Sequence, residues 1–158
     1  SKEKFIELVQ PTQKQRDELY LDELVLRFFS LFENHEKVTK NLSEHMTEYM
    51  KLATKGEVDY EAKVEVFNRV IDIVTPLGRS ALSGKNGQFS TSLYDGIFNG
   101  IANNIEYFEN ADDTILQEKV NALRDDEEFK KVSGVSSNYK ERVRKRIERA
   151  LEVFSPDD

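Results

Sequence analysis

The chain has 158 residues, which is enough for one domain with an apolar core of its own. It contains no cysteine, which excludes disulfides, thiolate-bound zinc and thiol nucleophiles and favours a reducing, cytoplasmic compartment. Its net charge of -7 argues against nucleic-acid binding over the whole surface, because neutralising phosphates requires concentrated Lys and Arg. No apolar run is long enough to span a membrane, so we expect a soluble protein with no membrane contact.

The first two predicted helices are set by one proline and by a strongly apolar segment. Pro11 ends a short helix at the start of the chain. The segment 17–33 follows, and between Leu19 and Phe32 its polar residues form one narrow stripe on a helix. These polar residues are Asp22, Glu23, Arg27 and Ser30. Because the rest of the segment is apolar, we expect it to be the central helix of a bundle.

Two further helices are predicted before residue 80. Asn41 or Ser43 is suited to cap the first of them, which runs to Lys55. Asp59 is suited to cap the second, which ends before Pro76. Apolar residues in this second helix repeat every three or four positions and predict one buried seam. The seam consists of Tyr60, Val64, Phe67, Ile71 and Val74.

A glycine-containing segment, about 83–92, predicts the one flexible loop of the chain. Ser90 or Ser92 then caps the next helix. Gly96 and Gly100 lie one turn apart on this helix, and such a pair of small residues favours close packing against a neighbouring helix. We therefore expect another helix to cross at these glycines.

The last third of the chain predicts two short helices and one longer helix. The helical pattern of 113–132 is interrupted by the acidic residues 125–128. Ser136, Ser137 and Asn138 form a capping segment before the final helix. Strand-like alternation occurs nowhere. The predicted fold is therefore all-α, a single bundle of six to seven helices that forms one domain over residues 1–158.

Reactive side chains form no recognisable catalytic or metal-binding motif. His35 and His45 are the only histidines, and neither has the neighbours of a helical metal site. Gly84 and Lys85 suggest a phosphate-binding loop, but the glycine spacing is wrong and Asn86 stands where Ser or Thr would hold magnesium. We therefore expect no enzyme activity in this chain, no cofactor and no metal.

Two groups of charged residues remain as candidate functional positions. Glu23 and Arg27 lie one turn apart on the most apolar helix, where a structural ion pair is favoured over an active-site pair. Four cations on one face of the last helix have two interpretations: a surface laced with ordinary ion pairs, or a face that contacts the phosphates of DNA. These cations are Arg142, Lys145, Arg146 and Arg149.

Four segments, in chain order, resemble segments of a large prokaryotic family. Residues 16–31 are similar to the pattern "R…D.ELVLRF.AL", and 41–50 to "G.L..FLNEYM". Residues 92–98 are similar to "N.ALF.A", and 136–148 to "STNS…RV..RI". The family is the domain-of-unknown-function group that includes GmrSD-type modification-dependent restriction proteins. The resemblance spans about residues 5–154.

The resemblance implies that the chain is the C-terminal helical part of a phage-defence protein. In that family a ParB/sulfiredoxin-like N-terminal domain with a D-G-Q-Q-R motif is linked to nucleotide handling and nuclease action, and the motif is absent here. No catalytic residue carries over, and Glu23, Arg27 and Arg146 correspond only to positions in the pattern. The expected partners are the missing N-terminal domain and DNA. The alternative is an interaction or homo-oligomerisation scaffold with no nucleic-acid role.

Overall fold

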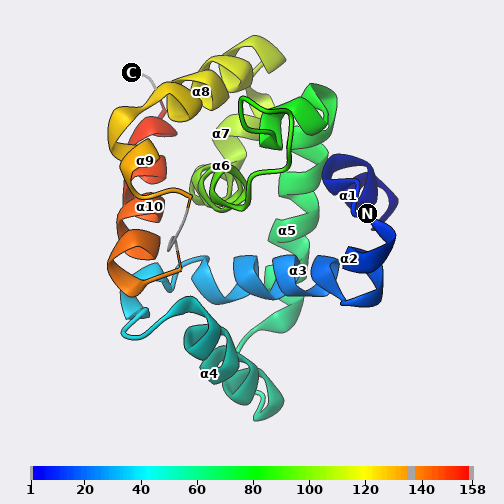
Figure 1. The fold of residues 1–158 in the computed structure, drawn as a ribbon, viewed down its shortest axis with the longest axis vertical. Coiled ribbons are helices and arrows are strands. Elements are labelled where there is room, and N and C mark those ends of the chain that lie inside the picture. Colours follow the sequence, from blue (N-terminus) through cyan, green and yellow to red (C-terminus); the bar gives the residue numbers. More distant parts are fainter. Residues whose placement is uncertain (1, 135–137, 157–158) are drawn as a thin grey trace.

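The computed structural model describes residues 2–134 and 138–156, and these residues form helices and no strand (Figure 1). The all-α prediction is confirmed. The described residues form ten α-helices, more than the six to seven expected. In chain order they are α1 (Lys2–Val9), α2 (Gln13–Asp17), α3 (Tyr20–Leu31), α4 (Leu42–Thr54), α5 (Tyr60–Val74), α6 (Thr91–Asn103), α7 (Ile105–Asn110), α8 (Asp113–Asp125), α9 (Glu127–Lys131) and α10 (Lys140–Val153).

The predicted helix over 17–33 is interrupted near its start. Leu19 lies between α2 and α3 and has a φ of 57°, in the left-handed region. A non-glycine residue rarely adopts this conformation, and its Cβ is crowded there by the following carbonyl oxygen. The chain therefore turns at Leu19, and α3 begins one residue later. Neither proline nor glycine marks the turn in the sequence.

The centre of the fold is α6, so the prediction that the segment 17–33 is the central helix is wrong. Of the 13 residues of α6, 11 are buried, whereas α3 exposes Asp22 and Glu23 and leaves Val25 and Leu26 only partly covered. Figure 1 shows α6 nearly end-on at the middle of the molecule, with α3, α5, α8 and α10 around it. The strongly apolar α3 therefore has more apolar surface than the core covers.

Gly96 and Gly100 of α6 are positions of close packing, as predicted. A Cβ atom at Gly100 would lie 2.6 Å from Cγ of Phe154, just after α10. A Cβ atom at Gly96 would lie 2.9 Å from Cδ2 of Leu123 on α8. Both distances are shorter than real carbon contacts, so the two glycines allow α8 and the end of α10 to approach α6.

Most predicted helix starts are confirmed by side-chain hydrogen bonds at the caps. Asn41, Asp59 and Ser90 each accept a hydrogen bond from a backbone N–H of the helix that follows. The predicted break at 125–128 is also present, and Asp126 caps α9. The predicted cap at Ser136 and Ser137 lies outside the described residues. The residue before α10 is Tyr139, whose side chain makes no capping bond.

The segment 83–92, predicted to be a flexible loop, contains a hydrogen-bonded turn. Ser83 and Phe89 form an isolated antiparallel bridge. The N–H of Gly84 donates to the carbonyl of Gln88 at 2.9 Å, and the N–H of Ser90 donates to the carbonyl of Leu82 at 2.8 Å. These bonds bring the two ends of the segment together immediately before α6.

Candidate functional site

The most strongly charged internal feature is a cluster of two arginines around one aspartate. Arg27 comes from α3, Asp95 from the central α6 and Arg146 from α10, and at most 4% of each residue is exposed. The Nε and Nη2 groups of Arg27 donate to the two Asp95 oxygens at 2.8 and 2.7 Å. Nη2 of Arg146 donates to Oδ2 of Asp95 at 2.8 Å. The cluster therefore ties three helices together inside the core.

The electrostatics of this cluster keep Asp95 ionised. Burial alone would raise the pKa of the Asp95 carboxyl, but Arg27 and Arg146 oppose it, and the pKa ends below its usual value. The neighbouring Tyr94 hydroxyl donates to the carbonyl of Leu24 at 2.6 Å, and burial raises the pKa of Tyr94 well above its ordinary value. All four side chains are held by hydrogen bonds inside the core and are closed to solvent, so the arrangement is suited to a structural role.

The predicted ion pair between Glu23 and Arg27 is wrong. The Glu23 side chain is exposed, and Arg27 pairs instead with Asp95, 68 positions further along the chain. Nη2 of Arg27 also donates to Oδ1 of Asn138 at 3.2 Å. Sequence reasoning missed Asp95, although an aspartate in the middle of a strongly apolar helix is itself a sign of a buried charged partner.

The predicted DNA-contacting face of α10 is divided between the core and local ion pairs. Arg146 is fully buried, so the expectation that it faces phosphates is wrong. Arg149 donates to Asp126 at 2.6 Å and to Glu152 at 2.5 Å, and these carboxylates raise its pKa. Nη2 of Arg142 donates to the carbonyl of Lys131 at 2.6 Å, and Lys145 is exposed.

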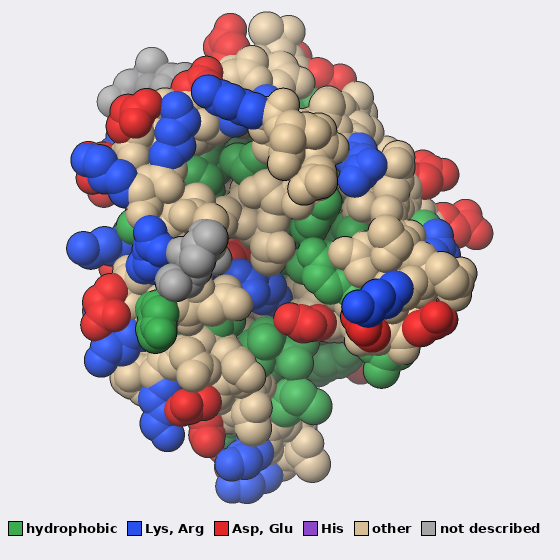
Figure 2. Space-filling model, viewed as in Figure 1, with side chains coloured by type: hydrophobic (Ala, Val, Ile, Leu, Met, Phe, Trp, Pro, Cys, Tyr) green, Lys and Arg blue, Asp and Glu red, His purple; other side chains and the backbone are tan. Residues whose placement is uncertain are grey.

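The surroundings of α10 are mixed in charge. Figure 2 shows Lys and Arg side chains interspersed with Asp and Glu along the edge of the molecule where Figure 1 places α9 and α10. Arg146 lies on the same buried side of α10 as Val143, Ile147 and Ala150, where α10 packs along α6. The helix therefore presents no continuous cationic face.

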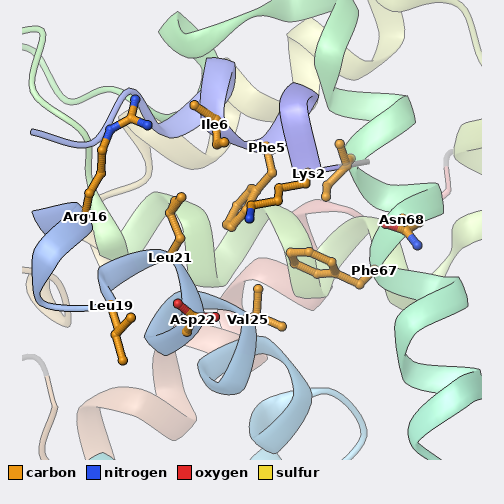
Figure 3. Close-up of a pocket in the computed structure, with 11 residues that line it drawn as sticks. Lys2, Phe5, Ile6, Arg16, Leu19, Leu21, Asp22, Val25, Phe67 and Asn68 are labelled. Carbon is orange, nitrogen blue, oxygen red and sulfur yellow. The ribbon is translucent and has the colours of Figure 1, made fainter. Parts of the chain in front are cut away.

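A different feature of the surface is an apolar groove between α1, α3 and α5, with a volume of about 550 Å³ (Figure 3). The figure shows Phe5 from α1, Val25 from α3 and Phe67 from α5 around this space. Lys2, Arg16 and Asp22 are the charged residues of its lining. We call this the α1–α3 groove.

A second groove lies on the other side of α3, between α3, α4 and the start of α5. Its volume is about 560 Å³. Leu26, Phe29 and Ala53 are among its apolar lining residues, and Leu19, Asp22 and Val25 line both grooves. We call this the α3–α4 groove, and the two grooves with the ridge of α3 between them the α3 surface.

Large apolar side chains are exposed on the α3 surface. Leu19 is 65% exposed, Met50 53% and Tyr60 55%, and all three line the α3–α4 groove. The prediction that Tyr60 belongs to the buried seam of its helix is therefore wrong. Figure 2 shows hydrophobic side chains gathered across the middle of this face, beside α3 and between α3 and α4. Exposed apolar patches are a common feature of interaction surfaces, so the α3 surface is the candidate site.

Leu19 combines this exposure with an unusual backbone conformation. The left-handed backbone conformation of Leu19 is unfavourable. Because the side chain is largely exposed, little free energy of burial offsets this cost. The turn at this residue presents its side chain on the ridge shared by the two grooves. Strained backbone conformations are concentrated at functional sites, which makes Leu19 a candidate residue of the α3 surface.

The described residues contain no group of three or more His, Cys, Asp or Glu side chains that is able to hold a metal ion. The His45 side chain is hydrogen-bonded to the backbone, with Nε2 2.7 Å from the Ser30 carbonyl oxygen. Within 2–134 and 138–156, no helix has the length and apolar character needed to cross a membrane.

The chain matches no protein-family model, no curated protein and no solved structure.

Proposed function

We propose that this chain is a non-catalytic docking module, which holds another folded protein domain through the α3 surface. The observation that carries the proposal is the pair of apolar grooves on either side of α3, with exposed Leu19 on the ridge between them. Two grooves that share one helix offer a partner an apolar face on each side of α3, with Asp22 on the ridge between them. Burial of such a face is the main favourable term in stable protein association.

The domain that we propose for this position is the ParB/sulfiredoxin-like domain of a GmrSD-like restriction or phage-defence protein. Support comes from the four segments that resemble this family. The first, 16–31, contributes Arg16, Leu19, Asp22 and Val25 to the α3 surface. Three of the four segments also meet in the buried cluster, through Arg27, Asp95 and Arg146. On this proposal the arginines of the pattern are structural residues.

The proposal is tested by binding of the ParB/sulfiredoxin-like domain to the chain and to two leucine variants. We expect Leu19→Asp to weaken binding by about tenfold or more, because a charged side chain would enter the centre of the interface. Aspartate tolerates the left-handed conformation better than leucine, so the fold should persist. Leu52→Asp is the matched control, since Leu52 is 42% exposed on α4 and lies outside the lining of both grooves.

Equal affinities of the two variants and the unsubstituted chain, measured by isothermal titration calorimetry, would remove the α3 surface from the proposal. The gene upstream of Ser1 provides an independent check, since a D-G-Q-Q-R motif there supports the family and its absence counts against it. Sedimentation velocity at several concentrations addresses the scaffold alternative. Self-association that Leu19→Asp abolishes would assign the α3 surface to a second copy of the chain.

A further inference from the structure

The α3–α4 groove has a one-sided charge pattern. Its charged lining residues are Glu18, Asp22 and Glu23, and its lining contains no Lys, Arg or His. Glu18 has a loose, exposed contact with Lys14, at 3.8 Å. Within the part of the chain that the structure describes, neither Asp22 nor Glu23 has an ion-pair partner. The groove therefore combines an apolar floor with an acidic rim.

A buried hydroxyl group provides a second, independent sign of an absent partner. Tyr49 of α4 lines the groove and is 5% exposed, and its hydroxyl makes no hydrogen bond among the described residues. An unsatisfied buried hydroxyl is costly, typically by about 1–3 kcal/mol. A tyrosine hydroxyl is a hydrogen-bond donor as well as an acceptor, and burial raises the pKa of Tyr49.

We propose that the α3–α4 groove binds an amphipathic helix of the partner protein, with an apolar stripe flanked by Lys and Arg. This inference rests on the proposed function and names the chemistry of the partner on one half of the α3 surface. Such a helix would insert apolar side chains, spaced by three and four residues, between α3 and α4. Its cations would lie beside Glu18, Asp22 and Glu23.

The geometry and charge of the groove favour this occupant over other classes. Both long walls are helices, and the described residues leave no strand edge to which an extended peptide would add. DNA and an anionic membrane surface are disfavoured, because their phosphates would face three carboxylates and no cation. The exposed Met50 and Tyr60 suit a helix partner. Methionine adapts its shape to the side chains that it contacts, and aromatic residues are enriched at protein interfaces.

Two synthetic helical peptides with identical leucine positions provide the test. One carries Lys and Arg beside the leucine stripe, and the other carries Glu at the same positions. By fluorescence anisotropy we expect the cationic peptide to bind the full chain about tenfold more tightly, with an affinity that falls as salt is added. A triple variant of the rim, E18K/D22K/E23K, is expected to lose this preference. The matched control makes the same change of charge at exposed acids outside the groove: E36K/E106K/E118K.

Circular dichroism first establishes that both triple variants are folded. Equal affinity for the two peptides, absence of binding by either, or equal effects of the two triple variants would overturn the inference. Leu19→Asp separates this failure from failure of the proposed function. If it weakens binding of the partner domain while neither peptide is preferred, the docking module stands and the basic helix does not. If it leaves domain binding unchanged, the docking module itself is wrong.

Discussion

Replacing Asp95 with asparagine is expected to lower the free energy of unfolding by about 3–5 kcal/mol. The variant keeps the size of the side chain but leaves Arg27 and Arg146 buried without their counter-charge. Because one carboxylate is the shared ion-pair partner of two buried guanidinium groups, the loss belongs with the largest that single substitutions cause. Urea denaturation followed by circular dichroism measures it. Asp72→Asn is the matched control, because Asp72 pairs with Lys4 at an exposed site, where the effect should be much smaller.

The same cluster predicts a pH dependence of stability. The pKa of Asp95 in the folded chain lies below its ordinary value of 3.8. Its stabilising contribution is therefore fully present above that ordinary value and is lost as the pH falls through the lower, folded-state pKa. The free energy of unfolding should fall more steeply below pH 4 in the unsubstituted chain than in Asp95→Asn. Parallel pH profiles would show that Asp95 is not the group responsible.

The second large effect is expected at Gly100. Alanine is the better helix former, by about 1 kcal/mol in an exposed helix. At Gly100, however, the new methyl group would lie 2.6 Å from Cγ and 2.8 Å from Cβ of Phe154, atoms close to the backbone that have little freedom to move. Overpacking of this kind typically costs about 1–3 kcal/mol, so Gly100→Ala should destabilise the fold. Thermal and urea unfolding both measure the change.

Gly96→Ala is the informative comparison for Gly100→Ala. The nearest atom to a new methyl group at Gly96 is Cδ2 of Leu123, at the far end of a flexible side chain, so a smaller loss is expected. A Gly100→Ala variant as stable as the unsubstituted chain, or more stable, would mean that Phe154 is free to move away. The close contact of α6 with the end of α10 would then not restrict this position.

Local signals in the sequence predicted most of the helices. Asn41, Asp59 and Ser90 cap helices as expected, because the competition between side chain and backbone for the first N–H groups is a local effect. The break at Leu19 was not predictable, since no glycine or proline marks it. The identity of the central helix was also missed, because α6 owes its burial to neighbours on several sides, which no local pattern reports.

The sequence contained part of the information about the candidate site. Its apolar segment 17–33 has only a narrow polar stripe, which is more apolar surface than a helix at the edge of a core buries. That excess is now seen as the α3 surface, yet the sequence alone suggested a central helix. Arg27 and Arg146 both pair with Asp95, which lies 68 and 51 positions away from them along the chain. The roles of Arg27 and Arg146 were therefore misassigned, because the charges of each helix were considered without those of the other helices.

The most direct test of the account is hydrogen–deuterium exchange of the chain, alone and bound to the ParB/sulfiredoxin-like domain that we propose as its partner. We predict slower exchange in the complex at the α3 surface, at the backbone amides of 18–29 and 49–54. Exchange over Lys140–Val153 should stay unchanged. Protection confined to Lys140–Val153, with the α3 surface exchanging at the same rate in both states, would contradict the account.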